Sequence, residues 1–162
     1  MVSHSGPLPA SAERRFADLH IELPPAPNPI GAYVESVQTG NLLSLSGVLP
    51  VAGGKPVFLG RLGNELTVEQ GSEAARLAAL NVISVARHQL SSLDKVSKVV
   101  KLTVYLATEG NFVAHAKVAD GASELLRDVF GEDKLPVRMV AGVQSLPLGV
   151  PVVVEVLFEV IA

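Results

Sequence analysis

The sequence predicts an α+β fold in which a β-sheet carries two helices on one of its faces. Five stretches have the length of strands and are rich in β-branched or other apolar residues. Two longer stretches have the length of helices, and the first of them places small apolar residues at helical spacing. The order of these segments is β-β-α-β-α-β-β, and two helices in such an order can cover one face of the sheet.

Residues 1–23 are interpreted as an N-terminal extension and residues 24–162 as a single domain. The extension starts with a loose segment rich in Ser, Pro and Ala, and residues 13–23 fit either a short helix or a strand. Four prolines among residues 24–29 indicate an extended connector.

The domain opens with a predicted β-hairpin. Residues 33–38 form its first strand, Thr39-Gly40-Asn41 its turn, and residues 42–46 its second strand. The glycine-rich residues 51–64 are expected to form a flexible loop at the rim. They lack both the Lys-Ser/Thr ending of a phosphate-binding P-loop and the spacing of a dinucleotide-binding motif.

The first helix begins at a capping box, Thr67-Val-Glu-Gln70, and is expected to run to about Leu90. A second helix is predicted over residues 112–130, where Gly121 indicates close packing or a break. His115 falls in its first turns. It has no histidine or carboxylate at a metal-binding spacing, so no metal site is expected.

A long strand is predicted over residues 96–107, and residues 135–162 form two further strands around a Pro/Gly turn at residues 146–151. The last strand places apolar side chains on both of its faces, with Val153 and Leu157 opposite the Val/Phe side. Because two helices cover only one face of the sheet, the other face needs a protein partner. The sequence therefore predicts an oligomer whose sheets meet.

Arg138 lies among apolar strand residues and shares its face with Val140. A charged group in such surroundings is costly unless an anion meets it. The planar guanidinium suits a carboxylate or phosphate bound through two hydrogen bonds. The alternatives are an ion pair with Glu155 or Glu159, or an arginine that reaches water from a sheet edge.

Composition limits the class of protein. The apolar fraction is 48% and the formal net charge is −3, with no block of like charges, which argues against a nucleic-acid or membrane surface. Cysteine is absent, so disulfides, thiolate metal sites and cysteine nucleophiles are excluded. We find no signal peptide and no run long enough to span a membrane, and a cytoplasmic protein is the simplest expectation.

Two motifs resemble the RidA/YjgF/UK114 family. The first is Ile30-Gly-Ala-Tyr33, followed by Gly40-Asn41 and then Ser46-Gly47-Val-Leu-Pro50. The second is Pro136-Val-Arg138, followed by Ser145-Leu-Pro147-Leu-Gly149 and a Val/Glu strand. The likeness runs from about Leu23 to the C-terminus, and Val118-Ala-Asp-Gly-Ala-Ser-Glu-Leu-Leu indicates an outlying branch of the family.

The resemblance implies a homotrimer of chorismate-mutase-like subunits with clefts between neighbours. It also implies hydrolysis of reactive 2-imino or 2-enamino acids to 2-keto acids and ammonia, with no cofactor. Arg138 would bind the substrate carboxylate, and Tyr33, Ser46 and the backbone of Val140 would line the pocket. Without the resemblance, Tyr33 is read as a rim aromatic and Ser46 as a serine at a strand end.

Two positions depart from the family pattern. Val153 stands where the first glutamate of the last strand is usual, and Ala116 stands where the archetype has an asparagine. Glu155 shares a face with position 153 and is the candidate replacement for the missing acid/base. The two positions are roughly 6.6 Å apart along a strand, so a register shift or bulge would be needed.

The residues and the family resemblance together indicate three candidate functions. The first is an imine/enamine deaminase with Arg138, Tyr33 and Glu155 as catalytic residues. The second is a non-catalytic trimer that binds small carboxylates such as 2-keto acids. The third is the endoribonuclease of the family's older label, which ranks last because no basic stripe or stacking aromatics support it.

Overall fold

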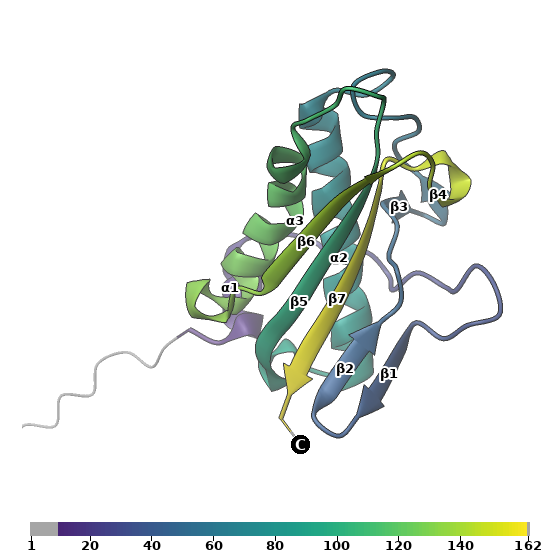
Figure 1. Ribbon diagram of the computed structural model, residues 1–162. Coiled ribbons are helices and arrows are strands. Elements are labelled where there is room, and N and C mark those ends of the chain that lie inside the picture. The colour runs from purple at the N-terminus through teal and green to yellow at the C-terminus, as the bar shows by residue number, and fades with distance from the viewer. Residues whose placement is uncertain (1–9, 162) are drawn as a thin grey trace, which may run out of the picture.

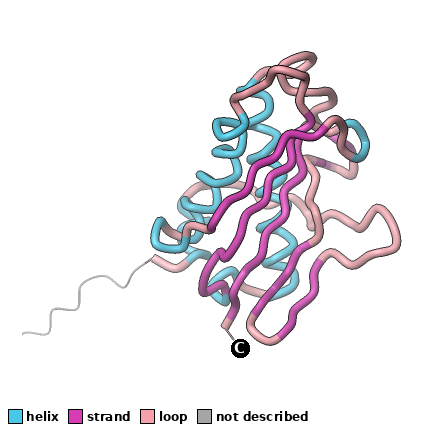
Figure 2. The backbone as a smooth tube through the Cα atoms, viewed as in Figure 1, coloured by secondary structure: helices cyan, strands magenta, loops and turns pink. Residues whose placement is uncertain are grey.

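The computed structural model describes residues 10–161. A five-stranded sheet forms one layer and helices form a second layer on one of its faces (Figures 1 and 2). The strands of this sheet are Ser36–Thr39 (β1), Leu42–Leu45 (β2), Val96–Ala107 (β5), Val137–Val143 (β6) and Val152–Val160 (β7). The helices are Ala12–Asp18 (α1), Val68–Leu90 (α2) and His115–Phe130 (α3). The predicted α+β class and the order of its main elements are confirmed.

The strands lie in the order β1-β2-β7-β5-β6. β7 is antiparallel to both β2 and β5, whereas β5 and β6 are parallel and are joined through α3. The sheet therefore ends in two different edges, β1 at one side and β6 at the other. Within one chain, residues of β1 and residues of β6 therefore lie at opposite edges of the sheet.

α2 begins where the capping box predicts. The Thr67 side chain accepts a hydrogen bond from the Gln70 backbone N–H, and the Gln70 side chain accepts one from the Thr67 N–H. The helix ends at Leu90, and Ser91 follows in the left-handed region with φ of 68°. α3 starts at His115 rather than at Phe112, and its N-cap residue Ala114 makes no side-chain capping hydrogen bond.

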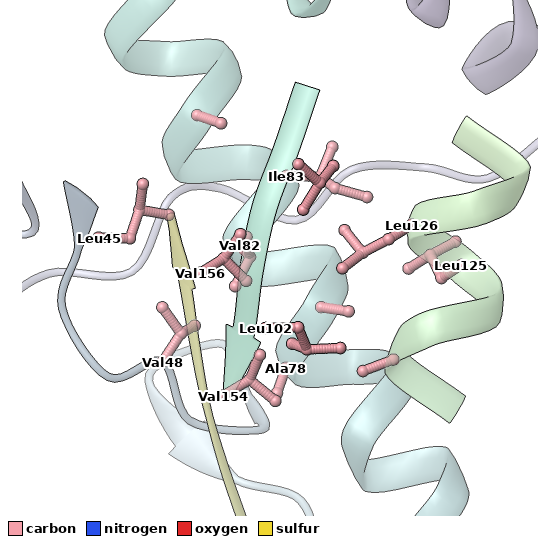
Figure 3. Close-up of a cluster of buried hydrophobic side chains, with 14 of the residues drawn as sticks. Leu45, Val48, Ala78, Val82, Ile83, Leu102, Leu125, Leu126, Val154 and Val156 are labelled. Carbon is pink, nitrogen blue, oxygen red and sulfur yellow. The ribbon is translucent and has the colours of Figure 1, made fainter. Parts of the chain in front are cut away.

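The core lies between the sheet and the helices. Alanines on α2 allow it to lie close to β7 and α3, and branched side chains of β5 and β7 fill the layer beneath it (Figure 3). Leu102 and Val156 are register partners on adjacent strands and both are buried in this layer. Gly121 lets α3 approach α2, because a Cβ there would lie 2.1 Å from the carbonyl oxygen of Ser72.

α1 also packs on the core, through Ala12 and Phe16. Glu13 accepts a hydrogen bond from the Leu93 backbone N–H and pairs with Arg87 at 3.1 Å. The segment 13–23, for which either a helix or a strand was predicted, is thus a short helix followed by extended chain. Residues 1–9 of the predicted loose segment lie outside the described residues.

The glycine-rich residues 51–64 contain a small hairpin, formed by Val51–Ala52 (β3) and Lys55–Pro56 (β4), where the sequence predicts only a loop. Gly53 and Gly54 both have positive φ, which is what a two-residue hairpin turn requires. The glycines are therefore explained by a turn and need no phosphate ligand.

Within residues 10–161, no helix lies on the second face of the five-stranded sheet (Figure 1). One row of paired residues crosses this open face from edge to edge: Val37, Ser44, Leu157, Lys101 and Val137. Val137 and Met139 are 68% and 56% exposed. The predicted apolar surface on the second face is confirmed.

Candidate functional site

Arg138 lies on the edge strand β6. Its parallel register partner is Leu102, whose side chain points into the core between sheet and helices. Paired residues point to the same face of a sheet, so Arg138 points to the helix-covered side and reaches the outer surface beside α3. The arginine is therefore not on the open apolar face.

The guanidinium of Arg138 contacts two side chains of α3. Its Nη1 donates to Asp120 Oδ1 at 2.7 Å and to Ser123 Oγ at 3.0 Å. The side chains of Arg138 and Asp120 are 27% and 50% exposed, so the ion pair is open to solvent. The sequence offers two alternatives for Arg138, an ion pair or an arginine that reaches water from a sheet edge, and the structure shows both together. The ion-pair partner is Asp120 in place of Glu155 or Glu159.

Val140 and Gly142 continue the same face of β6 toward the start of α3. Val140 is half-buried against the core. A Cβ on Gly142 would lie 2.7 Å from His115 Nε2 and 2.9 Å from Thr108 Oγ1. His115 therefore packs against β6 at this end, whereas the side chain of Arg138 is accessible to solvent at the other end.

Tyr33 and Ser46 lie near the opposite edge of the sheet, beside β1 and β2. Both line a cavity of about 480 Å³ that is roofed by the proline-rich residues 24–30. The Tyr33 hydroxyl accepts a hydrogen bond from the Ile30 backbone N–H at 2.9 Å, which holds the chain around this cavity. The cavity is lined mainly by apolar and backbone groups, with Glu35 as its acidic side chain.

Asn81 of α2 forms part of the floor of this cavity. The residue is buried, and its Nδ2 donates to the carbonyl oxygens of Leu49 and Val51 at 2.9 and 3.0 Å. These two bonds anchor the segment between β2 and β3 to the long helix. The sequence reasoning did not identify Asn81, although a lone amide on the alanine-rich face of a helix is a recognisable signal.

Glu155 lies on the open face of β7. Its register partner is Thr103, the neighbour of Leu102, so Glu155 and Arg138 project from opposite faces of one sheet. Val153 lies further along the same open face as Glu155, and its Cγ1 would be 2.9 Å from a Cβ on Gly47 at the cavity rim. Position 153 is therefore beside the Tyr33 cavity. Glu155 lies neither at this cavity nor beside Arg138.

The structure thus groups the predicted residues in two places. Tyr33 and Ser46 are together at the cavity, and Arg138 and Val140 are together on β6. Asp120 and Ser123 join the second group, and the sequence reasoning missed them because they lie on another element. Their spacing of three residues places both on one face of α3, which is the signal that could have indicated a shared contact.

A second cavity, of about 500 Å³, lies between residues 59–61 and the turn before β7. Arg61 borders it and pairs with Glu109 at 3.0 Å. The Arg61 backbone N–H also donates to Glu65 Oε2 at 2.9 Å, which lowers the pKa of Glu65. The charged groups here are thus bound to one another.

Across residues 10–161, no three His, Asp or Glu side chains converge in a way that could hold a metal ion. In the same range no helix is both long and apolar enough to cross a membrane.

Comparison with known proteins identifies relatives over nearly the whole chain. Residues 13–160 match the family model described as "YjgF/chorismate mutase-like, putative endoribonuclease". Protein TCP17 of Trypanosoma cruzi is 40% identical over 159 residues, covering 98% of this chain and 97% of that protein. A 2-iminobutanoate/2-iminopropanoate deaminase of Dermatophagoides farinae is 28% identical over 135 residues, covering 83% of this chain and 91% of the relative.

A solved structure from Shewanella oneidensis, described as a "putative endoribonuclease", has the same fold. It is 31% identical and superposes with a TM-score of 0.89, covering 93% of this chain and all of that one.

Proposed function

The chain belongs to the RidA/YjgF family, and from this premise we propose that it hydrolyses reactive 2-imino or 2-enamino acids to 2-keto acids and ammonia. The observation that carries the proposal is Arg138, a solvent-accessible arginine at the edge of the sheet. Every substrate of this class has a carboxylate, and a guanidinium binds one through charge-assisted hydrogen bonds. The name of the D. farinae relative supports the same reaction.

Imine hydrolysis requires few catalytic groups from the protein. An imine carbon is already electrophilic and reacts with water unaided, so a catalyst has to supply position, a water molecule and a modest acid or base. This reaction needs no cofactor.

We further propose a homotrimer in which the two groups of residues come from neighbouring copies. Within one chain Arg138 and the Tyr33 cavity lie at opposite edges of the sheet. The exposed apolar residues of the open face supply a surface for association, because such a surface gains stability when water leaves it. A neighbour could then bring Tyr33 and Ser46 to an Arg138 that is not its own.

A non-catalytic binder of small carboxylates is the second candidate function. The observation in its favour is that Val153 replaces the usual glutamate, while Glu155 projects from the face opposite Arg138. Such a protein would bind 2-keto acids at Arg138 and release no ammonia.

The test is Arg138→Ala, with Arg127→Ala as the matched control. Arg127 is another exposed arginine that pairs with an aspartate, Asp128, at 3.0 Å. Ammonia release is followed from 2-imino acids that an amino-acid oxidase makes in situ, and pyruvate binding is measured by calorimetry. Loss of a charge-assisted hydrogen bond of about 2 kcal/mol predicts about a 30-fold fall in kcat/KM for Arg138→Ala. The control is expected to match the wild type.

Three outcomes separate the candidates. If the wild type binds pyruvate but ammonia is released no faster than without protein, the protein is a non-catalytic binder and not a deaminase. Neither turnover nor binding would remove both functions. Turnover that survives Arg138→Ala unchanged would show that the carboxylate is bound elsewhere.

A further inference from the structure

The ion pair of Arg138 leaves a carboxylate beside the proposed anion site. Asp120 Oδ1 is 2.7 Å from Arg138 Nη1, and both contacts that the guanidinium makes with described residues run through that nitrogen. A ligand carboxylate approaching the rest of the guanidinium therefore arrives next to an aspartate. For a ligand that is only an anion, this aspartate is a repulsive neighbour.

A dipolar ligand reverses that repulsion. A 2-imino acid protonated on nitrogen carries a cationic iminium group one carbon away from its carboxylate. The Arg138–Asp120 pair offers charges of the opposite signs at a matching short separation. Ser123 fixes the other side of Nη1, so the guanidinium and the Asp120 carboxylate are held in a defined relative position.

We propose that Asp120 binds the protonated nitrogen of the substrate whose carboxylate Arg138 binds, and that it is the acid/base of the hydrolysis. This inference rests on the proposed function. It assigns the acid/base role to α3, since Val153 carries no carboxylate and Glu155 lies on the other face of the sheet. The site accordingly prefers 2-iminium acids to the 2-keto acids they become, which favours release of the product.

Asp120 can act both as the base that accepts a proton from water and as the acid that returns it to the substrate nitrogen. The water oxygen bonds to the iminium carbon, the π electrons of the C=N bond move to nitrogen, and a water proton passes to Asp120. The protonated Asp120 then returns this proton to the amine nitrogen. The hydroxyl lone pair forms the C=O bond as the C–N bond breaks, and the hydroxyl proton leaves with the departing ammonia as ammonium. The products are one 2-keto acid and one ammonium ion.

The test compares Asp120→Asn with Asp128→Asn. Asp128 is also on α3 and is also paired with an arginine, so it controls for the loss of one carboxylate from this helix. Calorimetry uses alanine as a stable dipolar probe and pyruvate as the purely anionic probe. Asp120→Asn is expected to weaken alanine binding at least tenfold and to bind pyruvate as tightly as the wild type or more tightly. Asp128→Asn should change neither.

Turnover is measured on the same variants. Asp120→Asn should lower kcat at least tenfold while the binding of pyruvate persists. Equal weakening of both probes would overturn the inference, because it would mean that Asp120 only positions Arg138. Wild-type turnover that Asp120→Asn leaves unchanged would also overturn it, with the deaminase function intact. Absence of wild-type turnover, with alanine binding that depends on Asp120, would refute the reaction while retaining the dipolar site.

Discussion

The two faces of the five-stranded sheet differ in how they are covered. On one face α2 and α3 lie on β5 and β7, and Leu102, Val154 and Val156 are fully or almost fully buried beneath them (Figure 3). On the other face Val137 and Met139 remain exposed, although they belong to the same sheet. Adjacent residues of one strand thus have opposite surroundings because strand side chains alternate.

The difference separates two kinds of constraint. The covered face is constrained by close packing within the chain, where the loss or addition of a methyl group changes stability directly. The exposed apolar side chains of the open face contribute little to the stability of a single chain, and we propose that they form the surface for association. Substitutions on the covered face should therefore change the free energy of unfolding, whereas substitutions on the open face should change the state of association.

The largest expected effect is on the covered face, at Gly121. In Gly121→Ala the new Cβ would lie 2.1 Å from the Ser72 carbonyl oxygen, so α3 must move away from α2. We expect a loss of about 3 kcal/mol in the free energy of unfolding, measured by urea denaturation. Gly110→Ala is the control, because no atom lies within 4 Å of its added Cβ. Stabilisation by Gly121→Ala, as alanine gives in an uncrowded helix, would contradict the close contact.

A smaller effect is expected at the start of the helix that covers the sheet. Thr67→Ala removes the side-chain oxygen that accepts from the Gln70 N–H and leaves that donor without its cap. We expect a loss of about 1 kcal/mol in the free energy of unfolding. Thermal and urea unfolding of Thr39→Ala, which alters a threonine at the end of β1, provides the comparison. Equal small changes in the two variants would show that the cap is not used.

The smallest effect on stability is expected on the open face. Met139→Lys should change the free energy of unfolding by less than about 0.5 kcal/mol, because the side chain is already 56% exposed. It should nevertheless lower the mass measured by sedimentation, since a charge in an apolar interface opposes association. Val113→Lys is the matched control, an 88% exposed apolar residue in the loop just before α3. If both variants keep the wild-type mass, this face is not where copies meet.

Local signals in the sequence predicted the elements of the covered face well. The capping box at Thr67 located the start of α2, and the β-branched run located β5 at residues 96–107. Of the two explanations that the sequence offers for Gly121, close packing or a break in the helix, the structure shows close packing. These features depend on residues that are neighbours in the chain, so the sequence carries them directly.

The surroundings of Arg138 could not be predicted in the same way. Its partner Asp120 is eighteen residues earlier and on another element, so their contact depends on how β6 packs beside α3. Asp120 takes the place of Glu155 or Glu159 in the ion pair, and the register with β5 sends Glu155 and Arg138 to opposite faces of the sheet. Spacing along one strand does not show which face of the sheet meets which helix.

The position of β7 has a consequence for how the protein is made. β7 lies between β2 and β5, yet it follows both of them in the chain. During synthesis, two units form before β7 is made: the hairpin of β1 and β2, and the unit of β5, α3 and β6. Until β7 is available, no strand joins these two units into one sheet. Each then presents an unpaired strand edge of the kind that promotes aggregation. Residues 152–160 pair with both edges at once, so the sheet is continuous only after this last strand has joined it.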